Sequence, residues 1–381
     1  LPHASGLMDM QTQPHYVQDI KASIDRFEER DMLFARQDLL RYFCSDSPQY
    51  RDYFKYPTDN EIFHQRMHHK AALGGMNSTD APIFRAQFSW IDQIGTETAV
   101  DGTPASNRVS FSPSRAAAKV KGIASMYGAD LVRVGPLDQR WTYSHVGATG
   151  GDRSGFLPWG TPIDLNRHSH AIALGFKMDR AHLAAAPHFP ALLASAQAYA
   201  LSAWVAVRLA EYIRQLGFSA RAHHFSNYQI LAVPVAVDGG MGELSRAGYL
   251  LTKEYGLGLR LSVVTTDLPL LHDAPRDIGV QSFCSSCLRC AQECPSGAIP
   301  AGDKVLHNGI YKWKLDEEKC YAYWHVNGTD CGICMAACPW TKPNTPFHRL
   351  MSEAASHTGP HQRWMAQADR LVYGKDRKSV V

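Results

Sequence analysis

The sequence has no strong excess of either charge. Its 381 residues include 39 Lys and Arg against 36 Asp and Glu, which leaves a net charge of +3. This balance argues against a dedicated nucleic-acid-binding protein, because such proteins usually carry a concentrated basic face. With 45% hydrophobic and 20% charged residues, the chain is also too apolar for an acidic disordered protein. Its length favours a globular protein of two or three domains.

A convincing membrane span and an Arg-Arg pair are also missing. The best apolar stretch, Ala191 to Val207, has only 17 residues and is interrupted by Ser195 and Gln197. A span needs about 20 mostly apolar residues, so we expect a buried helix here. Without an Arg-Arg pair the sequence holds no twin-arginine signal, and its first residue is Leu1 rather than Met.

Nucleotide-binding signatures are absent as well. No G-x-G-x-x-G opens a helix after an expected strand, and no Walker motif occurs. A Rossmann dinucleotide site is therefore not expected. The chemistry of this chain has to come from other residues.

Cysteine is scarce except in one block, which holds eight of the nine cysteines. A tight block predicts metal binding rather than a secreted disulfide framework. The motifs are Cys284-x2-Cys287-x2-Cys290-x3-Cys294-Pro295 and Cys320-x10-Cys331-x2-Cys334-x3-Cys338-Pro339. The first has the C-x2-C-x2-C-x3-C-P run of bacterial two-cluster ferredoxins. Zinc ribbons use paired C-x2-C knuckles, which leave the third cysteine and the Cys-Pro pair unexplained.

The spacing also predicts which cysteines share a cluster. Three thiolates in a tight loop bind three irons of one cubane, and the fourth lies where Pro forces the chain away, so it binds the other cluster. We therefore predict two 4Fe–4S clusters. Cluster 1 is assigned to Cys284, Cys287, Cys290 and Cys338, and cluster 2 to Cys320, Cys331, Cys334 and Cys294.

The rest of the sequence predicts mixed helices and strands. Ser112-Pro113 and Gly128 are the expected start and stop signals of a helix over 114–127, and Pro190 and Gly217 bound a second helix. Further expectations are a helical pattern over 17–43, irregular chain over 44–110, strands over 130–134, 171–178, 229–237 and 260–267, and a short helix over 242–251.

Four regions follow from this pattern. They are an N-terminal wrapping region (1–110), an α/β domain (111–275) with an insertion at 135–170, the cysteine module (276–345), and a loose or wrapping C-terminal tail (346–381). Mixed elements before residue 275 point to a sheet covered by helices. The fold class expected for the whole chain is α+β.

The order of motifs resembles the corrinoid-dependent reductive dehalogenases, the respiratory type in particular. The matching stretches, which span about residues 110–345, are Gly128-Ala-Asp-Leu-Val132, Arg140-Trp-Thr-Tyr-Ser144, Glu211-Tyr-Ile-Arg-Gln-Leu-Gly217, Gly240-Met-Gly-Glu-Leu244, Glu254-Tyr-Gly256, Thr266-Asp-Leu-Pro-Leu270 and Cys338-Pro-Trp-Thr-Lys342. The resemblance implies a nitroreductase-like α/β sandwich that binds a base-off corrinoid, followed by a ferredoxin-like module with two 4Fe–4S clusters. The corrinoid motif D-x-H-x-x-G is absent, which agrees with a cobalt that needs no protein His below it.

The resemblance also implies the catalytic residues. It places the family's Tyr at Tyr199, twelve residues before Glu211, and its Arg at Arg260. The family's Asn falls on Asn227, although about two extra residues within 221–226 make this position depend on where the insertion lies. Trp324 matches an aromatic residue of the substrate channel. The implied roles are proton donor for Tyr199, stabilisation of the tyrosinate by Arg260, and orientation of the halogen by Asn227.

Two other functions stay open at this stage. An epoxyqueuosine-reductase-like tRNA-modifying enzyme also uses a corrinoid and two clusters, but employs an Asp donor and a helical-repeat tail. An electron-carrier ferredoxin fused to a structural domain would contain no cobalt. The resemblance to the dehalogenases implies a small organohalide substrate, a quinol-linked or small redox protein as electron donor, a small membrane anchor protein, no nucleic acid, and a homodimer. It also implies that the protein is located at the periplasmic face of the cytoplasmic membrane, after export by the twin-arginine route and removal of the signal. The alternative location is the cytoplasm.

Overall fold

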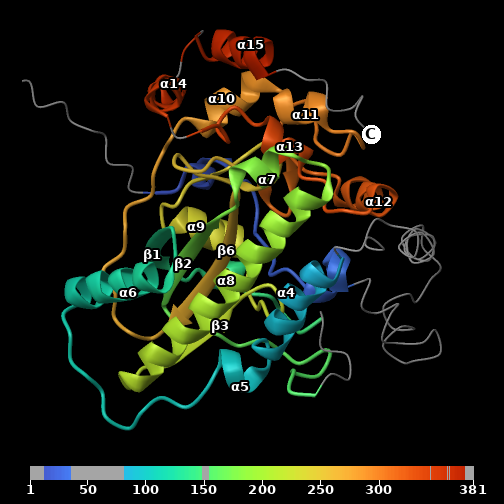
Figure 1. Ribbon diagram of the computed structural model, residues 1–381. Coiled ribbons are helices and arrows are strands. Elements are labelled where there is room, and N and C mark those ends of the chain that lie inside the picture. The colour runs from blue at the N-terminus through green and yellow to red at the C-terminus, as the bar shows by residue number, and fades with distance from the viewer. Residues whose placement is uncertain are drawn as a thin grey trace, which may run out of the picture.

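The computed structural model describes residues 13–35, 81–147, 154–343, 345–357, 359 and 361–373. Figure 1 shows a sheet with helices packed on it, and a group of short helices beyond one end of the sheet that contains the cysteine motifs. The two parts correspond to the middle and the C-terminal stretches of the chain.

An antiparallel sheet of four strands forms the centre of the first part. Its strands follow the order β1-β2-β6-β3, with β1 at Leu131–Pro136, β2 at His170–Lys177, β3 at Ala220–His223 and β6 at Leu259–Thr266. The register pairs Val134 with Ile172 and Ala173 with Val263. Almost every position of β2 and β6 is buried, so both faces of the sheet are covered.

Helices on both faces bury the sheet. Helix α8 (Phe189–Gln215) packs against β2, β3 and β6, and α6 (Pro113–Tyr127) packs against β1 and α8. Helix α9 (Ala232–Asp238) contributes to the separate core on the opposite face. By length and composition α8 could cross a membrane, but fifteen of its residues are buried in this packing. The predicted buried helix is confirmed.

The capping signals of α6 act as predicted. The Ser112 hydroxyl accepts a hydrogen bond from the Arg115 backbone N–H, and Pro113 occupies the first helical position. Gly128 ends the helix with φ 113°, a left-handed conformation that favours glycine.

Two predictions between the helices were wrong, and one strand was not predicted. Residues 229–237 form α9 rather than a strand, because Pro234 lies in the first helical turn, where its missing N–H has no intrahelical partner anyway. Residues 242–251 form a hairpin of β4 (Glu243–Leu244) and β5 (Leu250–Leu251), whose turn needs Gly248 at φ 79°. Strand β3 was not predicted, because Arg221 and His223 are polar and do not indicate a strand in which every residue is buried.

The chain before the sheet also differs from its prediction. The described part of 17–43 holds two short 3-10 turns, η1 (His15–Asp19) and η2 (Glu29–Asp31), and helical residues at 33–35, rather than one continuous helix. The apolar residues between them pack on the α9 side of the sheet as an extended segment. Within 44–110, two helices replace the expected irregular chain, α4 (Ala81–Gln93) and α5 (Glu97–Val100), while residues 36–80 lie outside the described part.

The remaining elements are short. They are η4 (Gln139–Trp141), α7 (Arg180–Ala184), β7 (Val305–His307) and β8 (Ile310–Lys312), which pair with each other, α14 (Pro346–Ser356) and α15 (His361–Tyr373). The predicted tail is therefore helical in its described part. Helix α15 packs against α10 (Val280–Cys287) of the cysteine module, which agrees with a wrapping arm rather than a loose one.

A buried carboxyl ties the N-terminal segment to the sheet. Asp238 accepts hydrogen bonds from the Tyr16 hydroxyl at 2.5 Å and from the Trp141 indole N–H at 2.7 Å. Burial raises the pKa of Asp238 to about 6 from 3.8, against the effect of these two hydrogen bonds. The folded state therefore binds the Asp238 proton more tightly than the unfolded chain, so this group's contribution to stability falls as pH rises between about 4 and about 6.

We expect Tyr16→Phe to destabilise the protein in a pH-dependent way. Above pH 7 the ionised Asp238 carboxylate would lose one of its two donors, at a cost of about 1–3 kcal/mol. At pH 5 the carboxyl is mostly protonated and the loss should be smaller. Thermal unfolding midpoints at pH 5 and pH 8 measure this, with the exposed Tyr311 changed to Phe as the control. Equal losses at both pH values would contradict the role given to Asp238.

Candidate functional site

Short helices present the eight clustered cysteines. The carriers are α10 (Val280–Cys287) and α11 (Arg289–Glu293) for the first motif, and α12 (Glu317–Asn327) and α13 (Ile333–Ala337) for the second. The last cysteine of each motif, Cys294 or Cys338, follows its helix with an extended backbone and precedes a Pro. The proline prevents the helix from continuing, so the last thiol leaves the loop that holds the other three.

The first group of thiols surrounds one cavity. Cys284, Cys287, Cys290 and Cys338 all line it. Burial raises the pKa of Cys284, and the neighbouring thiols of Cys290 and Cys338 raise it further. Cys338, from the second motif, thus lies with three cysteines of the first.

The second group contains the last cysteine of the first motif. Burial raises the pKa of Cys331 to about 12, and the nearby thiols of Cys320 and Cys294 add to the rise. Burial likewise raises the pKa of Cys320 to about 11, with Cys294 again a contributor. Burial raises the pKa of Cys334 as well, and the thiols of Cys320, Cys331 and Cys294 raise it further. Cys290 of the first group also contributes to this rise, so the two groups lie next to each other.

These thiols fit iron–sulfur clusters better than single metal ions. All eight are free of disulfides, and in the described part of the chain no three Cys, His, Asp or Glu ligands converge on one ion. A cubane needs such an open arrangement, because each thiolate binds a different iron. Burial keeps the thiols protonated until a metal displaces the protons. The ligand assignment itself stays a prediction.

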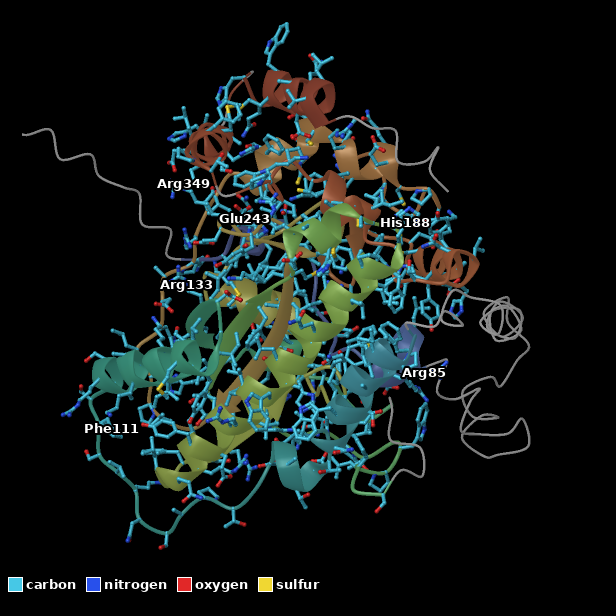
Figure 2. The ribbon with its side chains drawn as sticks, in the orientation of Figure 1. Arg85, Phe111, Arg133, His188, Glu243 and Arg349 are labelled. Carbon is cyan, nitrogen blue, oxygen red and sulfur yellow. The ribbon has the colours of Figure 1, made fainter. Side chains whose placement is uncertain are left out.

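Buried side chains of the β4–β5 hairpin hold the first motif in place. Glu243 is completely buried and accepts hydrogen bonds from the Ile278 and Val280 backbone N–H groups at the start of α10. Figure 2 shows Glu243 between the sheet and the cysteine module. Arg246 donates from Nε to the Cys284 carbonyl at 2.9 Å and stacks on Trp313 at 4.5 Å. These contacts join the β4–β5 hairpin to the cysteine module.

Tyr199 and Arg260, predicted as donor and stabiliser, meet between α8 and β6. The Arg260 guanidinium lies 5.0 Å from the centroid of the Tyr199 ring. It donates to the Ser195 hydroxyl at 3.0 Å from Nε and 2.7 Å from Nη2, and lies 3.5 Å from Asp330 Oδ2. The nearby Tyr199 and Asp330 raise the pKa of Arg260, although its burial acts in the opposite direction. Arg260 is thus a fixed cation against the tyrosine ring.

This pair lies beside the second group of thiols. Asp330 immediately precedes Cys331 in the chain, and Met335 Sδ lies 3.7 Å from Arg260 Nη1. Burial raises the pKa of the partly buried Tyr249 above its usual value, and Tyr249 is close enough to Cys320, Cys334, Arg260 and Tyr199 for each of them to influence that pKa. The Tyr199–Arg260 pair therefore lies next to the thiols that are predicted to bind cluster 2.

The side chain of Asn227 is engaged by protein partners. Its amide donates to the Gly95 carbonyl at 2.9 Å and to Glu97 at 2.8 Å, and its oxygen accepts from Arg221 at 2.9 Å. Arg221 in turn forms an ion pair with Glu97 at 2.6 Å. The structure thus places Asn227 in a buried network that anchors the loop before α5, and its halogen-orienting role stays a prediction.

Trp324 lies on α12 beside the second group of thiols. It packs near Cys331, and its ring is 5.7 Å from Tyr321 and 6.1 Å from Phe34. A hydrogen bond from Trp324 lowers the pKa of Cys320, while burial raises it overall. The aromatic group around Trp324 is consistent with a channel wall, and that role also stays a prediction.

Three residues of the site were not predicted from the sequence. Ser195 lies one helical turn before Tyr199, a spacing that puts both on one face of α8. Asp330 stands inside the long gap of the second motif, directly before a predicted ligand. Tyr249 carried no signal, because its position depends on the hairpin that had been predicted as a helix.

Comparisons with known proteins agree with these observations. Residues 283–342 match the model of a 4Fe-4S dicluster domain. A tetrachloroethene reductive dehalogenase of Sulfurospirillum multivorans is 35% identical over 60% of this chain and 51% of its own. A variant of the catabolic reductive dehalogenase NpRdhA superposes with a TM-score of 0.77 at 25% identity, over 94% of this chain and 48% of its own; that enzyme has also been solved with 3-bromo-4-hydroxybenzoic acid.

A further solved reductive dehalogenase, described with a mechanism for B12-dependent dehalogenation, superposes with a TM-score of 0.72 at 26% identity, over 96% of this chain and 48% of its own. The predicted resemblance to the reductive dehalogenases is confirmed in sequence and in fold. The chain spans about half the length of the relatives it matches.

Proposed function

Because the chain shares motifs and fold with the reductive dehalogenases, we propose that it removes halide from a small organohalide, using a corrinoid and two 4Fe–4S clusters. The observation that carries this proposal is the placement of Tyr199 and Arg260 together, beside the second group of thiols. One proton donor, one fixed cation and a nearby source of electrons are what the replacement of a halogen by hydrogen requires.

The residues present fit this chemistry. When bound, the corrinoid would supply a reduced cobalt centre able to break a carbon–halogen bond. In the described part of the chain the Tyr199 hydroxyl has no hydrogen-bond partner, so it is available to a substrate. A tyrosine is reluctant to protonate water but able to protonate a carbanion-like carbon, since its usual pKa is near 10. Arg260 would then stabilise the tyrosinate.

We also propose how the corrinoid is held, which partners the enzyme has and where it is located. The sheet with helices on both faces would be a nitroreductase-like sandwich that holds the corrinoid base-off, without a protein His below cobalt. A quinol-linked or small redox protein would reduce the clusters, and a small membrane protein would anchor the enzyme at the periplasmic face. Both partners and the location follow from the family resemblance.

Halide release tests the function directly. The corrinoid-loaded, chemically reduced protein is incubated with a panel of chlorinated and brominated alkenes and phenols, and free halide is measured against protein without corrinoid. An epoxyqueuosine-containing tRNA stem-loop is included as a competing substrate. Conversion of the RNA without any halide release would replace the proposal by the tRNA-modifying function.

We expect about eight irons and one cobalt per reconstituted chain, as two cubanes and one corrinoid require. Elemental analysis after reconstitution under corrinoid-replete conditions measures both metals. Iron near four would remove one cluster from the proposed electron path. Protein with full iron but no cobalt would fit an electron-carrier ferredoxin instead.

A further inference from the structure

In the described part of the chain, the buried hydrogen-bond donors without a partner include two aromatic side chains beside the thiol groups. The indole N–H of Trp340 and the hydroxyl of Tyr323 are both shielded from solvent and make no hydrogen bond in the described part of the chain. A buried donor left without an acceptor costs about 1–3 kcal/mol, and such groups are uncommon in folded proteins. Each donor therefore calls for an acceptor that the polypeptide does not supply.

Trp340 belongs to the first group of thiols. It follows Cys338-Pro339, is only 5% exposed, and lines the cavity formed by Cys284, Cys287, Cys290 and Cys338. Arg246, on that cavity, carries only donors, which it directs to three backbone carbonyls, and the Ser245 hydroxyl, which donates to the Tyr249 carbonyl, does not accept from Trp340. The other polar atoms that the lining side chains bring to this cavity are the four cysteine sulfurs, where a cluster would be held.

Tyr323 occupies the corresponding place at the second group. It lies on α12 three residues after Cys320 and packs in the small core around Cys331. Burial raises the pKa of Tyr323 to about 12, and the thiols of Cys331 and Cys294 contribute to the rise because they are close to the hydroxyl. Its surroundings therefore again offer sulfur as the acceptor.

We propose that Trp340 donates a hydrogen bond to a sulfur of cluster 1, and Tyr323 donates one to a sulfur of cluster 2. Both clusters gain negative charge on reduction, so a hydrogen bond to their sulfur favours the reduced state and raises the reduction potential. The two residues would thus adjust the two steps of the electron path separately. This inference rests on the two-cluster assignment.

The test compares Trp340→Phe and Tyr323→Phe with the wild-type protein, all reconstituted with iron and sulfide. Each substitution removes the donor and keeps an aromatic ring. Potentiometric titration followed by EPR should show one cluster per variant becoming harder to reduce, by about tenfold in the equilibrium constant, which equals about 59 mV for a one-electron couple. ENDOR in H2O and D2O should show one exchangeable proton lost from that same cluster.

Each variant serves as the control for the other, and Trp141→Phe serves as a remote control because its indole N–H donates to Asp238. Unchanged potentials in protein that holds about eight irons would overturn the inference while leaving the clusters in place. Equal shifts of both clusters by one variant would also overturn it, since a local hydrogen bond cannot act on both. Wild-type protein with about four irons would overturn the two-cluster assignment and this inference together.

Discussion

Replacement of Tyr199 by Phe is expected to lower the rate of halide release by at least about 100-fold. General acid catalysis typically contributes about 10²–10⁴-fold, and the substitution removes only the hydroxyl. The contacts of the ring with Phe225 and Arg260 do not involve that hydroxyl, so the fold should persist. Reduction of cobalt by the clusters should continue, because Tyr199 is not a cluster ligand. Dehalogenation rates at matched cobalt content measure the effect.

The matched control for this experiment is Tyr212→Phe on the same helix, further from Arg260. It should leave the rate near that of the wild type. Arg260→Met should also slow turnover, because the tyrosinate would lose its neighbouring cation. A near-normal rate for Tyr199→Phe would show that water or another residue supplies the proton, and Tyr199 would then be a packing residue of α8.

The second large effect concerns the crossed ligand assignment, in which each cysteine motif supplies its last cysteine to the cluster of the other motif. Cys294→Ala is expected to remove cluster 2, because the thiol of Cys294 lies with those of Cys320 and Cys331. Adding Cys320→Ala should cause no further loss, and iron should stay near half of the wild-type content. Adding Cys290→Ala instead should remove cluster 1 as well. Iron content and the EPR signals of the reduced protein measure both combinations.

These double variants distinguish the crossed assignment from an arrangement in which each motif binds its own cluster. Single variants cannot distinguish the two, because each would remove one cluster in either arrangement. If each motif held its own cluster, Cys294→Ala with Cys320→Ala would destroy both clusters, and Cys294→Ala with Cys290→Ala would destroy only one. The outcomes are therefore reversed between the two arrangements. Cys44 lies outside the cysteine block, so Cys44→Ala provides a cysteine-removal control that should retain all the iron.

Local signals in the sequence were sufficient for some elements and not for others. The caps of α6 and the length of α8 are properties of neighbouring residues, so both helices could be predicted. Strand β3 could not, because the burial of His223 depends on a hydrogen bond to Thr265, 42 residues away. The Val-rich α9 has strand propensity, and its packing against the sheet overrides that propensity.

The candidate site shows the same division. Motif spacing suggested how the thiols would group, because proline and cysteine act within a few residues of each other. The partners of Asn227 could not be predicted, since Gly95 and Glu97 lie about 130 residues earlier in the chain. The contacts of Arg260 with Ser195 and Asp330 likewise bring together three separate elements. Only the folded chain shows these long-range contacts.

The grouping of Cys338 with the first motif has a consequence for biosynthesis. While the ribosome is still making the stretch after Cys294, the nascent chain has only three ligands for one cubane and one ligand for the other. With the predicted ligand assignment, cluster 2 would gain its full ligand set once Cys334 has emerged, and cluster 1 would have to wait for Cys338. Iron–sulfur delivery is then a late event, and a chain interrupted before residue 334 would offer the assembly machinery no complete site at all.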